Sequence, residues 1–372
     1  MLRKFIMAFS ALTVFLISKA QETSVALNTN STSLAEQKPA DTEKKPLVTI
    51  TGSADAYYRY DFAKTKANNF TSFTGSHNAF ALGMASVKLE HKSDKVGAVL
   101  DLGFGPRAKE FSYTDDGITQ AIKQLYISYS PAPWIKFTAG TWATHVGYEL
   151  LDPQLNRNYS MSYLFTNGPF SHTGIKADLT KGKHGFMIGI SNACDYRLPP
   201  DGYINKKFIT AQYSVAISDN VKAYLNYWSG QAPDTSKSKQ FDLVLTGKIN
   251  DKFNIGFDGA VTSTKQWDGT KNIDGKSWWG SALYLNLDPK SWFGLTLRGE
   301  YFSDKNQLKT FSLAPQGGTV FATTLSANFK VDNFILIPEF RVDKASKKIF
   351  VDKDGLGVSS AGNFLIAAVY SF

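Results

Sequence analysis

The connections between strand-like segments constrain this chain more than the segments do. Runs of about nine to fifteen residues alternate apolar with polar or small side chains, the period of a β-strand whose two faces meet different surroundings. Tight connections rich in Asp, Asn, Gly and Pro alternate with polar connections of about 9 to 26 residues, without an exception. The strands are predicted at about 47–62, 78–90, 95–105, 118–130, 135–145, 172–181, 184–193, 208–218, 221–229, 240–250, 253–264, 276–288, 292–304, 318–331, 333–343 and 362–372.

This alternation favours a barrel that is closed within a membrane. A soluble sandwich or propeller has no reason to keep long loops at one end and short turns at the other. Outer-membrane barrels do, because their turns face the periplasm and their loops face outside. The sequence therefore predicts an all-β fold, a transmembrane antiparallel up-and-down β-barrel of about 16 strands (14 to 18 allowed) spanning residues 47–372.

The remaining sequence features exclude several other classes. No apolar run reaches the roughly 18 to 20 residues that a membrane-spanning helix needs. The single cysteine, Cys194, excludes a disulfide framework and a cysteine-based metal site. No G-x-S-x-G, H-E-x-x-H or P-loop motif occurs, and we expect no enzyme, cofactor or metal. The only grouping that could serve a hydrolase is His145 or His172 with Ser160 or Ser171 and Asn158.

The N-terminal segment predicts export. Two basic residues, Arg3 and Lys4, precede an apolar stretch that ends in small residues at Ala20, the order typical of a cleaved signal peptide spanning residues 1–20. Residues 21–46 are polar and contain no aromatic residue, which predicts a flexible periplasmic leader. Cleavage removes three of 41 basic residues and lowers the formal net charge from +9 to a modest +6, so no nucleic-acid partner is expected. The predicted location is the bacterial outer membrane.

Charged side chains of these runs share the face opposite the large apolar ones. In the run 292–304, Arg298 and Glu300 oppose Leu297 and Tyr301. A charge that faces lipid at mid-bilayer costs roughly 2–4 kcal/mol, so the polar face must point inward. Sixteen strands leave an aqueous channel that tolerates charges of both signs. The side chains predicted to line the lumen are Asp55, Arg59, Lys88, Glu90, Arg298, Glu300, Glu339 and Arg341.

The predicted strand 333–343 fits this pattern less well. Pro338 removes a donor from the ladder, so a bulge or an early strand end is expected there. Ile335 and Ile337 fall on the nominally inner face, and the sequence pattern gives no reason for apolar residues at these positions.

The third long connection, about 146–171, is the longest of the chain. Long loops of this kind are usually functional. If this loop folds into the lumen, Glu149, Asp152 and Arg157 form a charged pore constriction, because rings of charge select among ions. The alternative is a loop exposed at the barrel mouth.

The same loop carries a family resemblance. Residues Gly147-Tyr148-Glu149, Asn156, Asn158-Tyr159-Ser160, Asn167, Pro169 and His172-Thr173-Gly174 resemble the beta-barrel porin-2 (OmpL-like) family, which is common in Bacteroidetes. The resemblance covers about residues 47–372. It implies an outer-membrane barrel with passive solute passage, and it supplies no agreed binding residues. The C-terminal alternation ending in Phe372 resembles the signal read by the barrel-assembly machinery, which implies that machinery as a folding partner.

We therefore expect a porin for the passive diffusion of small hydrophilic solutes. The alternative is a substrate-specific channel, for example for oligosaccharides, whose sugar rings stack on inner-face aromatics. A closed-lumen barrel that acts as an enzyme or adhesin is the less favoured alternative. Expected partners are outer-membrane lipid and small hydrophilic solutes. The sequence leaves a monomer and a homotrimer, the state of many general porins, both open. The inner-face aromatics considered for stacking are Tyr57, Trp142, Tyr224 and Trp228.

Overall fold

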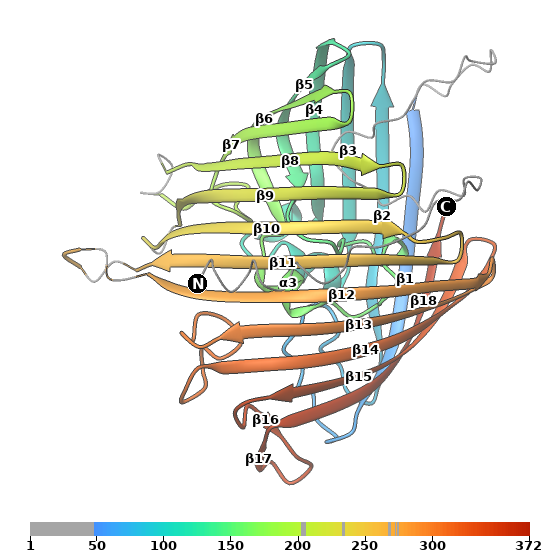
Figure 1. The fold of residues 1–372 in the computed structure, drawn as a ribbon, viewed down its shortest axis with the longest axis vertical. Coiled ribbons are helices and arrows are strands. Elements are labelled where there is room, and N and C mark those ends of the chain that lie inside the picture. The colour runs from blue at the N-terminus through green and yellow to red at the C-terminus, as the bar shows by residue number, and fades with distance from the viewer. Residues whose placement is uncertain (1–47, 202–205, 233–234, 267–268, 272, 274) are drawn as a thin grey trace.

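The computed structural model describes residues 48–201, 206–232, 235–266, 269–271, 273 and 275–372. In this part of the chain, sixteen antiparallel strands close into one barrel, in which each strand pairs with its neighbours in barrel order (Figure 1). The last barrel strand, β18, pairs with β1 and completes the ring. The predicted sixteen-stranded up-and-down barrel is confirmed.

The strands have the following bounds. They are β1 (Val48–Asp61), β2 (Ala79–Lys92), β3 (Val96–Phe104), β4 (Ile122–Ala132), β5 (Ile135–Ala143), β6 (Ser171–Lys181), β7 (His184–Ser191), β8 (Phe208–Ser218), β9 (Val221–Gln231), β10 (Lys237–Lys248), β11 (Phe253–Lys265), β12 (Lys276–Lys290), β13 (Phe293–Asp304), β14 (Gly318–Val331), β15 (Phe334–Ala345) and β18 (Ser360–Ser371), with β16 (Phe350–Val351) and β17 (Gly357–Val358) forming a separate two-stranded sheet in the last loop.

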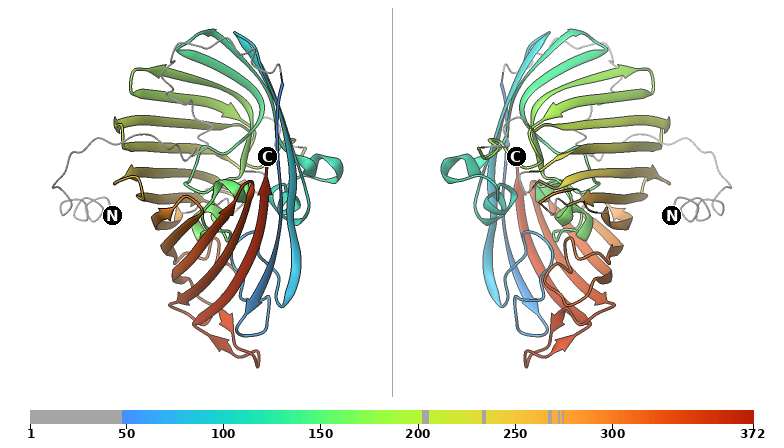
Figure 2. Two further views of the ribbon diagram at one scale, coloured as in Figure 1. Left: turned by 90° about the vertical axis from the view of Figure 1, so that its right-hand side faces the viewer. Right: turned by 90° about the vertical axis from the view of Figure 1, so that its left-hand side faces the viewer.

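In the residues that the structure describes, helical structure is confined to loops. It comprises α2 (Pro106–Phe111), α3 (Tyr163–Asn167) and the 3-10 turns η1 (Gly117–Ala121) and η2 (Pro153–Leu155). None of the helices in the described ranges is long and apolar enough to cross a membrane. Figure 2 shows the barrel from two opposite sides, with the green segment that contains α3 inside the ring of strands.

The two faces of each strand differ as the alternation predicts. In β18, Phe364 and Tyr370 are exposed on the outer surface, whereas Leu365, Ala367 and Val369 between them are buried. A one-residue change of register would exchange the two sets, so the alternation fixes the pairing. The outer surface is the apolar face that a membrane barrel presents to lipid.

The alternation of short turns and long loops places two distinct ends on the barrel, called here the turn end and the loop end. Two connections at the loop end differ from the prediction. Because β9 and β10 extend further than their alternating pattern, the fifth loop is only residues 232–236, so the expected minimum of about nine residues is wrong. The predicted strand 118–130 begins at Ile122, because η1 precedes it and the Asp116 carboxylate accepts a bond from the Gly117 amide (2.8 Å).

The strand containing Pro338 neither ends nor bulges. Pro338 lies opposite Ile366 in an unbroken ladder with β18. On the β14 side the pairs at Ile337 and Pro338 are missing, but the register on both sides of the gap is the same. The expected bulge is therefore wrong: the strand loses ladder pairs locally, and continuous pairing with β18 carries it past the proline.

Candidate functional site

The third long loop crosses the interior of the barrel. This loop, residues 144–170 and called L3 below, leaves β5 and runs first along the inner wall of β10 and β11. There the Gly147 amide donates to the Asp242 carboxylate (3.1 Å) and the Tyr148 amide to the Asp258 carboxylate (3.2 Å). Its middle part then meets β13, β14, β15 and β1, as described next.

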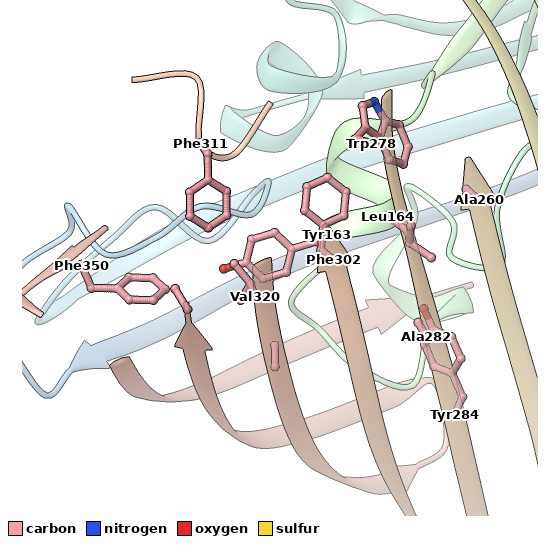
Figure 3. Packing of buried hydrophobic residues seen from close by; sticks show 12 residues of the cluster. Tyr163, Leu164, Ala260, Trp278, Ala282, Tyr284, Phe302, Phe311, Val320 and Phe350 are labelled. Atoms are coloured by element: carbon pink, nitrogen blue, oxygen red, sulfur yellow. The ribbon is translucent and has the colours of Figure 1, made fainter. Parts of the chain in front are cut away.

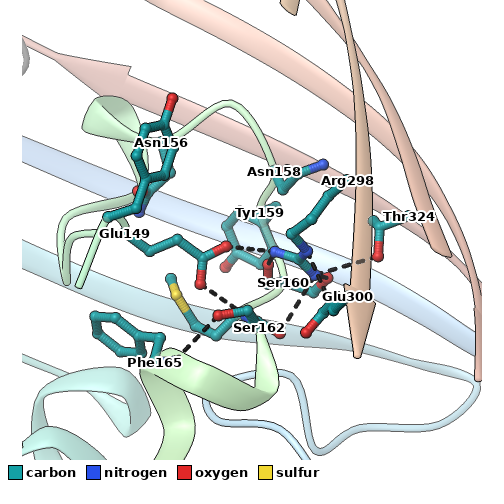
Figure 4. A network of polar contacts seen from close by, with 12 residues as sticks. Glu149, Asn156, Asn158, Tyr159, Ser160, Ser162, Phe165, Arg298, Glu300 and Thr324 are labelled. Atoms are coloured by element: carbon teal, nitrogen blue, oxygen red, sulfur yellow. Dashed lines mark hydrogen bonds and ion pairs between the residues drawn. The ribbon is translucent and has the colours of Figure 1, made fainter. Parts of the chain in front are cut away.

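Arg298, on the inner face of β13, is the centre of the contact between L3 and the wall (Figure 4). Its guanidinium pairs with Glu149 of L3 (2.5 Å) and with Glu300 on its own strand (2.9 Å). It also donates to the L3 carbonyls of Ser160 (2.7 Å) and Met161 (3.3 Å). Arg298 is fully buried, so these partners replace the water that the charge has lost.

Inward carboxylates hold the L3 backbone on the neighbouring strands. The Glu339 carboxylate of β15 accepts from the amides of Tyr159 (2.9 Å) and Ser160 (3.2 Å), and Glu300 accepts from the Tyr163 amide (2.8 Å). Arg341 of β15 donates to the Met161 carbonyl (2.9 Å). Charge-assisted bonds of this kind are roughly twice as strong as neutral ones, so the residue 159–163 segment is rigidly placed.

Apolar side chains complete the attachment of L3. In α3, which begins where the Ser162 hydroxyl accepts from the Phe165 amide (3.0 Å), Tyr163 stacks on Phe302 of β13. Figure 3 shows this packing, with Leu164 of α3 in the same cluster as Trp278. The cluster joins the loop to the inner faces of β11 to β14.

The inner face of β15 and β18 is apolar because L3 covers it. Ile337 is fully buried in a cluster with Leu365, Tyr57 and the L3 residue Tyr159, and Ile335 packs against the same cluster. The inward isoleucines, which the sequence pattern does not explain, therefore pack against L3 in an apolar contact and do not line the water-filled lumen.

Two glycines of the wall leave room for L3. A Cβ at Gly83 would lie 1.7 Å from an Asp55 carboxylate oxygen and 2.7 Å from the Tyr159 hydroxyl, which donates to Asp55 (2.5 Å). A Cβ at Gly256 would lie 2.4 Å from the Tyr148 ring. Only glycine fits at these points of close approach.

The three residues predicted to form the constriction all point to charged partners on the wall. Glu149 is buried against Arg298, Asp152 pairs with Lys123 of β4 (2.5 Å), and Arg157 pairs with Asp288 of β12. Asp152 and Arg157 keep 19% and 17% of their side-chain surface exposed, whereas Glu149 keeps 4%. Asp152 and Arg157 are therefore the two of this set that reach solvent.

The eight residues predicted to line the lumen separate into two groups. Lys88 and Glu90 form an ion pair (3.1 Å) that remains accessible to solvent. The other six, which lie nearer mid-height or the loop end, are buried by L3 or by neighbouring side chains. Arg59, for example, pairs with Asp61 (3.2 Å) and donates to the Ser76 carbonyl (2.8 Å). The six buried residues are Asp55, Arg59, Arg298, Glu300, Glu339 and Arg341.

Sequence reasoning missed Arg107 as a residue of this site. Arg107 lies in α2 of the second long loop, is buried, and donates to the Leu151 carbonyl of L3 (3.1 Å). Its guanidinium stands over the rings of Phe73 and Tyr159, at 4.9 and 4.7 Å from their centroids. The short helix gave no periodic signal, so nothing in the sequence indicated this inward position.

A second missed residue, Asp195, holds the end of L3 from the fourth long loop, residues 192–207. Its Oδ1 atom accepts from the amides of Phe170 (2.7 Å) and Ser171 (2.8 Å), and its Oδ2 atom accepts from the Tyr113 hydroxyl (3.2 Å). Burial raises the pKa of Asp195 to about 6, although these hydrogen bonds oppose the rise.

The hydrolase-like grouping does not assemble. His172 bonds to the Thr144 hydroxyl (3.1 Å), and His145 lies 3.3 Å from the Tyr227 carbonyl. Ser160 contacts Arg298 instead, and Asn158 donates to Ser326 (2.6 Å). Across the described ranges, no group of three or more His, Cys, Asp or Glu residues is placed to hold a metal ion.

Solved outer-membrane proteins share this architecture at low sequence identity. The outer membrane channel DcaP of Acinetobacter baumannii is 12% identical over 87% of this chain and 97% of its own, with a TM-score of 0.60. An anion-selective porin from Comamonas acidovorans is 10% identical over 87% and 99%, with a TM-score of 0.58. The trimer form of OmpT, an outer membrane protein of Vibrio cholerae, is 12% identical over 87% and 99%, with a TM-score of 0.57.

No curated protein matches the sequence. The family model described as "Putative beta-barrel porin-2, OmpL-like" matches residues 47–372, which is almost the whole barrel-forming part of the chain. The chain belongs to this family of β-barrel porins.

Proposed function

We propose that this porin allows passive diffusion of small hydrophilic solutes across the outer membrane, through a water-filled lumen narrowed by L3. The observation that carries the proposal is the attachment of L3 to the inner wall at strands distributed around the ring, at Lys123 of β4, Asp242 of β10 and Glu339 of β15. A loop fixed in this way narrows a wide barrel without detaching, and the polar inner face of sixteen strands favours water.

Within this proposal, Asp152 and Arg157 are the constriction residues that a solute meets. Both are partly exposed, and both side chains are held by wall residues of opposite charge. Glu149 is a positioning residue, because it is buried between Arg298 and the Ser162 amide (2.7 Å).

The oligosaccharide-specific alternative has less support from the aromatic residues. Tyr57 packs on Tyr159, Trp142 lies against His172, and Trp228 stacks on Phe208, and all three are buried. Of the four aromatics considered, only Tyr224 keeps partial exposure. The closed-lumen alternative, an enzyme or adhesin, has less support as well, because no catalytic grouping is assembled in the described ranges. We propose that the chain has no enzymatic activity.

The cellular context completes the proposal. Residues 1–20 act as a cleaved signal peptide and 21–46 as a periplasmic leader; both segments lie outside the described residues. The turn end faces the periplasm and the loop end faces outside. The proposed partners are outer-membrane lipid, the barrel-assembly machinery during folding and two further copies in a homotrimer, whose mass in mild detergent distinguishes it from a monomer.

Swelling of liposomes in neutral sugars of increasing size tests the diffusion role. We expect swelling rates to fall steeply with solute size, and Asp152→Ala with Arg157→Ala to admit larger sugars. Liposomes with the heat-unfolded protein are the control. A rate that saturates with one sugar favours the specific channel. No swelling from a demonstrably folded barrel favours the closed-lumen alternative.

A further inference from the structure

Below L3, towards the turn end, the barrel interior carries a group of lysines that the attachment of L3 does not use. Four of them lie within about two residues of a short turn, and Lys88 lies somewhat deeper. They come from strands distributed around the ring, so they surround the lumen instead of forming a patch on one side. These vestibule lysines are Lys88, Lys136, Lys222, Lys248 and Lys330.

The strand register shows that their side chains face inward. Alternate residues of a strand share one face. Lys330 follows Asn328 by two positions, and the Asn328 amide donates to the Arg157 carbonyl of L3 (2.9 Å). Lys222 precedes Asn226 by four positions, and the Asn226 amide donates to the L3 anchor Asp242 (2.5 Å).

The other three lysines are placed in the same way. Lys248 follows the inward Asp242 by six positions in β10. Lys136 lies 3.9 Å from Asp178, which also contacts the buried Lys176. Lys88 is directly opposite Asp101, whose carboxylate pairs with the inward Lys123 (3.0 Å).

The vestibule lysines are wet, unlike the charges around L3. Lys136, Lys248 and Lys330 keep 34%, 36% and 37% of their side-chain surface exposed. Lys222 is also exposed. A hydrated ammonium in a confined passage attracts mobile anions, since low-dielectric walls focus its field.

Cations outnumber acids in this region. The acids are already shared: Glu90 binds Lys88, and Asp288 is held by both Arg157 and Lys330 (3.7 Å). The cations are Lys88, Lys123, Lys136, Lys176, Lys222, Lys248, Lys330 and Arg157. The acids are Glu90, Asp101, Asp152, Asp178, Asp251 and Asp288, so eight cations face six acids.

Acidic residues outnumber basic ones around L3, but their carboxylates are buried and do not face the water in the lumen. Asp55, Asp242, Glu300 and Glu339 are each at most 7% exposed, and each accepts bonds from backbone amides or neighbouring side chains. Their negative charge is therefore largely compensated by these hydrogen bonds and acts weakly on an ion in the lumen.

From this distribution we propose that the lumen selects for small anions, such as inorganic phosphate and small carboxylates, and that the vestibule lysines set this preference. The inference rests on the proposed diffusion role. Rings of fixed charge select among ions in this way.

Reversal potentials of the full mature chain in planar bilayers, under a roughly tenfold KCl gradient at low total salt, test the proposal. We expect chloride to be favoured over potassium by roughly threefold to tenfold, because surface potentials of several kT enrich counter-ions. The triple variant Lys136→Gln, Lys222→Gln and Lys248→Gln shifts the potential to zero or to the cation side. Inorganic phosphate added at the turn side reduces the chloride current of the unmodified protein, and reduces it less in this variant.

A matched control removes three lysines from the loop end, Lys344→Gln, Lys347→Gln and Lys348→Gln, and leaves the reversal potential unchanged. Heat-modifiable migration in gels confirms that each variant is folded. Conductance with a neutral or cation-favouring potential in the unmodified protein overturns the anion proposal alone, since the buried acids would then dominate the field. Absence of conductance from the folded barrel overturns the diffusion role and the anion proposal together.

Discussion

Replacing Arg298 by glutamine is expected to loosen L3 while leaving the barrel intact. The substitution removes the cation between Glu149 and Glu300 and the donors to the carbonyls of Ser160 and Met161. Removing one partner of a buried ion pair costs about 3–5 kcal/mol, because the remaining charge stays buried without compensation. Since every 1.4 kcal/mol is a factor of ten, the detached population of the loop rises roughly a hundredfold to a few thousandfold.

Hydrogen exchange read by mass spectrometry measures this population directly. The amides of Tyr159, Ser160 and Tyr163 are held by wall carboxylates and exchange only when the loop detaches. We expect their exchange to accelerate by the factor above and the strand amides to stay protected. The double variant Glu149→Gln with Arg298→Gln is expected to recover part of the protection, because it removes the Glu149 charge while Glu300 keeps its contact with Arg341 (3.4 Å).

Lys344→Gln is the matched control, since it removes one positive charge at an exposed position next to the inward Asp343 of the same region. Its loop amides are expected to exchange as in the unmodified protein. Exchange in Arg298→Gln within a few-fold of the unmodified rate would refute the anchoring role of this arginine.

Three further substitutions change other contacts of L3, at Tyr159, Gly83 and Asp195. Tyr159→Phe leaves the buried Asp55 carboxylate without its hydroxyl donor, and we expect a loss of about 1–3 kcal/mol in the unfolding free energy, read from the urea midpoint in lipid vesicles. Gly83→Ala is expected to accelerate exchange at the Tyr159 amide, whereas Gly299→Ala, whose Cβ would meet nothing within 4 Å, should not; equal effects would count against close packing of L3 on the wall. The folded-state pKa of Asp195, about 6, lies above the ordinary value of 3.8, so the folded state binds this proton more tightly; its contribution to stability is fully present below pH 4 and is lost as pH rises through 6. We therefore expect the difference in melting temperature between the unmodified protein and Asp195→Asn to depend on pH between 4 and 6, and a constant difference would contradict the shift.

The barrel could be predicted from the sequence because its determinants are local. The alternation within about ten residues shows which side chains of a strand share a face, and the turn or loop is the segment between two such runs. The faces of Arg298 and Glu300 were therefore assigned correctly as inward. The contacts of inward side chains with L3 were not predictable in the same way, because they join residues far apart in the sequence. The Glu339 carboxylate, for example, accepts from the Tyr159 amide, 180 positions away.

The alternating pattern shows which face of a strand points inward, but it does not show whether that face meets water or a loop. The alternating pattern predicts that the inward charges line a wet lumen, whereas five of them bind L3 and Arg59 is buried against Asp61 and the Ser76 carbonyl. One signal was present: Ile335 and Ile337 on β15, together with Leu365 and Val369 on β18, form an apolar stretch on a face that water would otherwise reach. An apolar stretch on the inner face of a wide barrel indicates a covering segment, and L3 is that segment in this barrel.

Single-channel recording of the purified mature protein in a planar bilayer, at two salt concentrations, distinguishes an open, water-filled lumen from a closed one. A water-filled lumen narrowed by L3 predicts stable conductance steps that scale with salt, and larger steps in Arg298→Gln, where the loop is loosened. A demonstrably folded barrel that gives no steps in either protein would show that the lumen is closed.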